Sequence, residues 1–95
     1  MIVKLIEVVG HHNIGESSYT LREVFINPEQ IICLREDPLT DSKLQAGLLP
    51  ENLDQRQKFT TIYLNNWSGP SPTVVGDPAS IREKLNIETR ALLKG

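Results

Sequence analysis

The alternation of apolar and polar positions predicts several short strands and one capped helix. Residues 59–64 (Phe-Thr-Thr-Ile-Tyr-Leu) alternate between two faces, as in a half-buried strand. After a segment rich in turn-forming residues, a last strand begins at Thr73. Asp77 and Pro78 then form a cap and first turn for a helix with apolar residues four positions apart, Ile81 and Leu85. This order of strand, turn, strand and helix predicts an architecture and no chemical activity.

The first third of the chain predicts further strands. Residues 2–9 are rich in β-branched side chains and end at Gly10, which is typical of a strand. Apolar residues occupy both of its faces, which favours a central strand or one covered in a dimer. The other elements predicted here are a loop over residues 11–18 with Asn13 and Gly15 as turn residues, a strand over 19–26, a turn over 27–29 and a short buried strand over 31–34.

Residues 36–58 form an insertion between the third and fourth strands. Asp37 followed by Pro38 is a favourable start for a helix, and Gly47 is a favourable stop, so a short helix is predicted between them. The rest of the insertion is irregular but apolar. An ordered insertion of this length is more often functional than not, and the alternative is a flexible excursion.

Together these elements predict one α+β domain over residues 1–95. Its small antiparallel sheet has four to five strands, with a C-terminal helix packed on one face and a short helix in the insertion. Beyond Leu85 the apolar residues leave the helical stripe. Residues 87–95 are therefore predicted to be a tail or a second short helix capped by Asn86.

Composition limits the possible functions. A chain of 95 residues with 39% hydrophobic and 5% aromatic residues builds one core, mainly from Val, Ile and Leu. Domains of this size bury too little surface to be very stable, so a partner or a second copy would help. The N-terminal segment is interrupted by charges, and no apolar run is long enough to span a membrane, so we expect a cytoplasmic protein.

The charge pattern argues against nucleic-acid binding. The formal net charge is −2, and the ten Lys and Arg residues are scattered along the sequence. A nucleic-acid-binding protein normally carries a basic stripe. The alternative of a nucleic-acid-binding regulator requires folding to bring four basic residues together: Arg22, Arg35, Arg56 and Lys58.

No catalytic or cofactor-binding constellation is evident, so we expect no enzyme activity and no cofactor. His11 and His12 could ligate a metal, but adjacent side chains in an extended segment point apart, and a solvated turn explains them better. Cys33, the only cysteine, lies in an apolar run where a thiol behaves as a small hydrophobic group. A metal-binding or small enzyme domain using the two histidines stays a less favoured alternative.

Trp67 is the most informative candidate for binding. The only tryptophan of the chain lies in a polar turn, and tryptophan is enriched among interface anchors. The alternative is that Trp67 folds back over the sheet. Leucines of the insertion pose the same choice, since they could cap one end of the sheet or contact a partner. The candidate residues for binding a protein partner are Trp67, Tyr63, Leu44, Leu48 and Leu49.

Four segments of the chain resemble the FlbD-like proteins, a small family associated with bacterial flagellar operons. The same architecture recurs in short phage proteins. The segments are residues 2–5 (Ile-Val-Lys-Leu), 25–31 (Phe-Ile-Asn-Pro-Glu-Gln-Ile), 61–64 (Thr-Ile-Tyr-Leu) and 74–75 (Val-Val) with the helix that follows. The resemblance implies a compact antiparallel sheet with a C-terminal helix, and no enzyme activity. We therefore expect a small non-catalytic module for protein interaction or regulation, a bacterial or phage accessory protein that binds a protein partner or self-associates.

Overall fold

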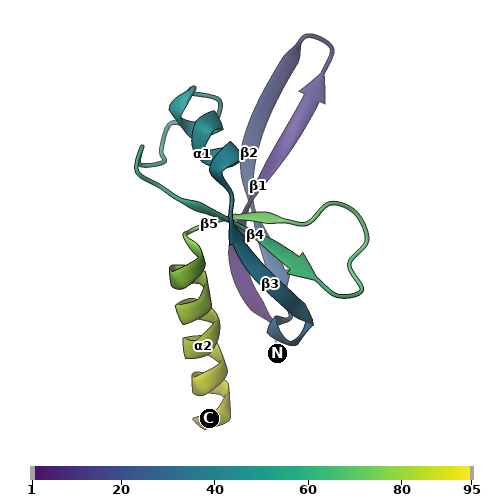
Figure 1. Cartoon of the computed structure of the whole chain (residues 1–95), viewed down its shortest axis with the longest axis vertical. Coiled ribbons are helices and arrows are strands. Elements are labelled where there is room, and N and C mark those ends of the chain that lie inside the picture. Colours follow the sequence, from purple (N-terminus) through teal and green to yellow (C-terminus); the bar gives the residue numbers. More distant parts are fainter. Residues whose placement is uncertain (1, 95) are drawn as a thin grey trace.

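The fold is α+β, as the sequence predicts: one five-stranded antiparallel sheet with two α-helices (Figure 1). The computed structural model describes the backbone of residues 2–94, and the side chains of residues 2–86 except 13, 16 and 17. The strands are β1 (Val3–Asn13), β2 (Glu16–Ile26), β3 (Ile31–Glu36), β4 (Phe59–Leu64) and β5 (Thr73–Val75), and the helices are α1 (Pro38–Gln45), α2 (Pro78–Lys94) and the 3-10 turn η1 (Pro28–Gln30).

The sheet has the strand order β2-β1-β5-β4-β3. The last and shortest strand, β5, lies in the centre of the sheet. It joins the β1–β2 pair to the β3–β4 pair, because it pairs with β1 on one side and with β4 on the other. The edges of the sheet are therefore β2 and β3. This arrangement places β1 in the interior, as its two apolar faces predict.

The β1–β2 hairpin corrects the predicted loop over residues 11–18. Both strands have eleven residues, and their pairing continues from Val3 opposite Ile26 to His11 opposite Ser18 and beyond. Only two residues, Ile14 and Gly15, form the turn, with Gly15 in the left-handed region at φ 80°. Polar residues dominate this end of the hairpin because it extends past the core, so burial imposes no alternation there.

Two hydrophobic clusters lie on opposite faces of the sheet. Adjacent residues of a strand point to opposite faces, and in β5 Val74 belongs to one cluster while Val75 packs against the other. On the first face α2 covers the sheet with Ile81 and Leu85. The strand residues buried beneath it are Val3, Leu5, Ile26, Ile62 and Val74.

The insertion over residues 36–58 covers part of the second face. Leu44 of α1 and Leu49 after it are 2% and 6% exposed, and they pack with Phe59 at the start of β4. Their burial means that these two leucines cap one end of the sheet. Of the two roles that the sequence leaves open for these leucines, the structure shows the first for Leu44 and Leu49, which are core residues and present little surface to a partner.

Asp37 joins the insertion to the sheet through one carboxylate. Its Oδ1 accepts a hydrogen bond from the backbone N–H of Thr40, which confirms the predicted helix cap. Its Oδ2 accepts hydrogen bonds from three hydroxyls, those of Thr40 (3.0 Å), Thr61 (3.2 Å) and Thr73 (3.0 Å). Burial raises the pKa of Asp37, but these hydrogen bonds together outweigh burial and hold the pKa below its usual value.

The start of α2 is similarly determined by local contacts. Asp77 Oδ1 accepts a hydrogen bond from Ser80 N–H (3.0 Å), as the predicted cap requires. The preceding Gly76 has φ 122°, and its carbonyl accepts a hydrogen bond from Thr60 Oγ1 (2.7 Å). From Pro78 the helix continues to Lys94 without a break, so the tail or second short helix predicted after Asn86 is instead part of α2.

Substitution of Gly76 tests the tight passage between β5 and α2. A Cβ at this position would lie 2.9 Å from Ile81 Cδ1, and its φ is unfavourable for residues with a side chain. We expect Gly76→Ala to lower the free energy of unfolding by about 2–4 kcal/mol. Gly69→Ala is the control, because Gly69 also has a positive φ but faces open space. An equal loss in both variants in urea titrations would show that the contact with Ile81 contributes nothing.

Substitution of Asp37 tests the hydroxyl cluster. Asparagine also caps helices well, so Asp37→Asn keeps the cap but replaces an acceptor of three hydroxyls with an amide. We expect this variant to lose about 1–3 kcal/mol of unfolding free energy at neutral pH. The matched variant Asp77→Asn, at a cap without such a cluster, should lose much less stability than Asp37→Asn.

The same pair of variants predicts a pH dependence. Because the pKa of Asp37 is lowered on folding, its stabilisation is complete above the unfolded pKa, near 4, and is lost as the pH falls through the folded pKa. Urea titrations between pH 7 and pH 2.5 should therefore show a smaller acid loss for Asp37→Asn than for the unchanged protein. Identical acid losses would exclude a contribution from Asp37.

Candidate protein-interaction surface

Trp67 lies in the loop between β4 and β5, where the loop's own contacts hold it. Asn66, just before it, has a left-handed backbone with φ 55°, and Gly69 after it has φ 94°. The indole Nε1 donates a hydrogen bond to the carbonyl of Pro70 at 3.0 Å. With its polar atom paired inside the loop, the indole is 43% exposed and presents an apolar surface to the outside.

One side of Trp67 borders a cavity of about 330 Å³, which we call the Trp67 pocket. The apolar lining comes from three parts of the chain, since Ile2 precedes β1, Phe25 and Ile26 end β2, and Leu64 ends β4. The remaining lining residues besides Trp67 all carry carboxamides: Asn27, Gln30, Asn65 and Asn66.

Backbone hydrogen bonds around η1 bring these parts together. Asn27 caps the turn, because its Oδ1 accepts from Glu29 N–H and its carbonyl accepts from Gln30 N–H. The carbonyl of Gln30 then accepts a hydrogen bond from Asn65 N–H at 2.7 Å. This last bond connects η1, which follows β2, with the residue after β4, so the pocket is part of the folded framework.

The pocket combines exposed apolar side chains with an uncharged rim. Ile2 and Phe25 are 58% and 59% exposed, which is unusual for large apolar residues that lie next to one another. Among the described residues that line the pocket, none is Asp, Glu, Lys or Arg. Gln30 Oε1 is buried and has no hydrogen-bond partner among the described residues. The apolar walls formed by Ile2, Phe25 and Trp67 suit an uncharged, apolar group.

The structure separates the residues that the sequence suggested as partner contacts. Trp67 lies in the pocket, but Tyr63 (39% exposed) does not line it, and Leu48 is an exposed residue just after α1. The residues that join Trp67 are Ile2 and Phe25, which sequence reasoning treated only as strand positions. The signal that could have found them is that the first two strands have apolar residues on both faces. This pattern did not specify which face would remain uncovered.

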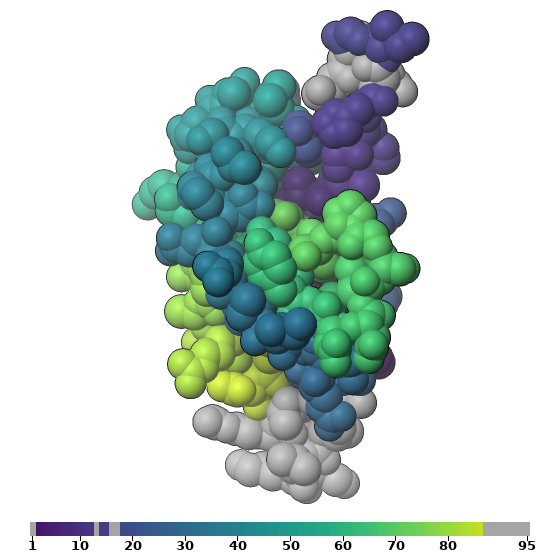
Figure 2. All heavy atoms as spheres, turned by 45° about the vertical axis from the view of Figure 1, so that its right-hand side comes forward, coloured from purple at the N-terminus to yellow at the C-terminus, as the bar shows by residue number. Residues whose placement is uncertain are grey.

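The other side of Trp67 borders a second cavity, also of about 330 Å³. It is lined by β1 from Glu7 to Gly10, by Arg22 and by the loop from Trp67 to Thr73. Glu7 and Arg22 pair across the hairpin, with Arg22 Nε 2.9 Å from Glu7 Oε1. Figure 2 shows the loop, in green, on the surface beside the purple hairpin. Trp67 therefore separates an apolar pocket from a more polar one.

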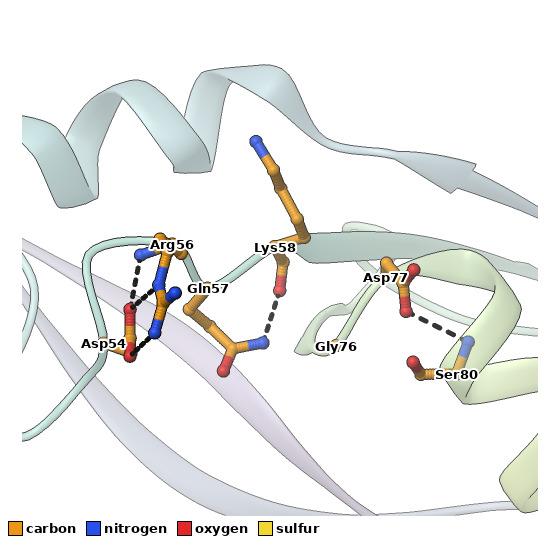
Figure 3. Close-up of a pocket in the computed structure, with 7 residues that line it drawn as sticks. All are labelled: Asp54, Arg56, Gln57, Lys58, Gly76, Asp77 and Ser80. Atoms are coloured by element: carbon orange, nitrogen blue, oxygen red, sulfur yellow. Dashed lines mark hydrogen bonds and ion pairs between the residues drawn. The ribbon is translucent and has the colours of Figure 1, made fainter.

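A third cavity, of about 360 Å³, lies at the start of α2, and its charges are already paired (Figure 3). Arg56 turns back onto Asp54, whose pKa is lowered by hydrogen bonds from the side chain and the backbone of Arg56. Lys58 points toward α1, where its Nζ lies 3.3 Å from Asp41 Oδ2. The cavity therefore offers no free positive charge to an anion.

Folding also keeps the basic residues of the nucleic-acid hypothesis apart. Arg22 is on edge strand β2, whereas Arg35 is on β3 at the opposite edge of the sheet. Arg56 and Lys58 are near the start of α2 and, like Arg22, have acidic partners. The described residues contain no continuous basic stripe formed by these four side chains.

The residues weighed for catalysis or metal binding do not converge either. His11 donates to or accepts from Thr20 Oγ1 at 2.9 Å, and His12 packs edge-on against Tyr19. Cys33 is half-buried, next to a bulge in β3. Within the described part of the chain, no group of three or more His, Cys, Asp and Glu side chains is placed to hold a metal ion.

Comparison with known proteins identified no relative: no family model, no curated protein and no solved structure matches the chain. Among the residues that the structure describes, no helix is long and apolar enough to cross a membrane.

Proposed function

We propose that this protein is a small non-catalytic interaction module, and that its Trp67 pocket receives an apolar side chain of a protein partner. The observation that carries the proposal is the joint exposure of Ile2, Phe25 and Trp67 around one cavity. Fully burying a large apolar side chain contributes about 1.5–3 kcal/mol. Covering these three residues would therefore supply a substantial part of a specific interaction.

The size and rigidity of the pocket support a protein partner. The volume of about 330 Å³ is at the low end of the roughly 300–1,000 Å³ usual for small-molecule pockets, so it leaves room for a side chain and little more. Trp67 is already held by its bond to Pro70, so little freedom is lost when a partner binds. Preorganised aromatic residues are common among interface anchors.

The uncharged lining favours a protein surface over a nucleic acid. Nucleic acids are bound chiefly through phosphate contacts with Lys and Arg, and the pocket lining has none. The resemblance to FlbD-like proteins supports a role as a bacterial or phage accessory protein. In that role the partner is another protein of the same assembly or a second copy of the chain.

Two exposed apolar residues allow a matched test of this proposal. Phe25→Ser removes the largest exposed wall of the pocket, whereas Ile32→Ser changes a residue of similar exposure (67%) that does not line it. In affinity capture from the native host, we expect one specific protein to be recovered with the unchanged chain and with Ile32→Ser. Its affinity for Phe25→Ser should be about 5- to 30-fold weaker in a binding titration.

Two results would contradict this proposal. A partner that binds both variants with the same affinity would show that the Trp67 pocket is not the contact site. A salt-dependent shift with DNA or RNA, without any protein partner, would instead favour the nucleic-acid alternative.

A further inference from the structure

The outer part of the β1–β2 hairpin forms an arm that projects beyond the rest of the molecule (Figures 1 and 2). The whole chain is 49 Å long and only 19 Å in its shortest dimension. At the tip of the arm, Ile14 is fully exposed. Two-residue hairpin turns are normally built from Gly, Asn and Asp, so a large apolar side chain at this position is unexpected.

Contacts along the arm join its two strands below the turn. A hydrogen bond joins His11 to Thr20 across the two strands, and the rings of His12 and Tyr19 meet edge-on. Lys43 of α1 lies over the Tyr19 ring, with Nζ 4.8 Å from its centroid, which ties the arm to the insertion. Because these contacts already order the arm, Ile14 can bind a pocket with little further loss of conformational entropy.

The Trp67 pocket lies at the other end of the same hairpin. Ile2 precedes β1 and Phe25 is near the end of β2, whereas Ile14 is at the turn between these strands. At about 3.3 Å per residue, eleven residues separate the two ends by roughly 35 Å. A chain therefore cannot place its own Ile14 in its own pocket.

We infer that Ile14 of one copy inserts into the Trp67 pocket of a second copy. This inference rests on the proposed function and names the occupant of the pocket. The aliphatic side chain of Ile14, the knob of the arm, matches the apolar wall formed by Ile2, Phe25 and Trp67. Because the described lining is uncharged, insertion of Ile14 would leave no charged group buried without a partner.

The contact joins different surfaces of the two copies, and this determines the form of the assembly. Each copy offers one knob and one pocket at opposite ends, so the interface is head-to-tail and leads to a ring or a filament. A single apolar anchor gives weak binding, so assembly should be observed at protein concentrations up to about 1 mM.

Sedimentation velocity with complementary variants tests the inference. We expect the average mass of the unchanged chain and of Ile32→Ser to rise with concentration. Ile14→Ser, which lacks the knob, and Phe25→Ser, which lacks an intact pocket, should each remain monomeric. Their equimolar mixture should form a dimer and nothing larger, because one intact knob meets one intact pocket.

Several results would overturn the inference. A monomeric unchanged chain at all concentrations, assembly retained by Ile14→Ser, or an equimolar mixture that stays monomeric each excludes head-to-tail insertion of Ile14. If the chain is monomeric but loses a protein partner on Phe25→Ser, the proposed function holds and only this inference fails. Circular dichroism verifies that the variants are folded, and Ile2→Ser replaces Phe25→Ser if that variant unfolds.

Discussion

The carboxylate of Asp37 is the interaction on which the rest of the structure depends. It caps α1, and in the same place it accepts hydrogen bonds from hydroxyls of β4 and β5. A half-buried carboxylate is favourable only when its oxygens have donors, and here the cap and the sheet supply them together. This one group therefore fixes where the insertion lies on the sheet, and with it the second hydrophobic cluster.

The two coverings of the sheet leave the Trp67 pocket open. On one face α2 packs over the central strands, and on the other the insertion buries Leu44, Leu49 and Phe59. At the end of the sheet where Ile2 and Phe25 lie, α2 packs with Val3 and Ile26 on the opposite face, and Ile2 and Phe25 stay 58% and 59% exposed. A small domain has too few residues to cover every apolar strand position, so this region stays exposed unless a second molecule covers it.

The proposed function and the inferred assembly follow from this distribution of surface. The pocket is apolar, uncharged and preorganised, and the hairpin arm carries an apolar knob away from the body of the chain. Several charged residues are instead paired locally, as Arg56 is with Asp54, and Arg22 and Arg35 lie on opposite edges of the sheet. Recognition through apolar shape is consistent with all of these features.

The sequence by itself determined the features that depend on neighbours in the chain. The strands, the turn at residues 27–29 and the caps at Asp37 and Asp77 were predictable, because periodicity and capping act over a few residues.

Only the tertiary structure decided features that depend on distant pairing. These include the extension of the hairpin through His11 and His12, the burial of Leu44 and Leu49, and the meeting of Ile2 and Phe25 with Trp67. The physical reason is that the hydrophobicity of a residue does not specify which surface will cover it. Strand order and register assign that surface, and they are set by contacts between segments far apart in the chain, as in the pairing of Glu7 with Val74.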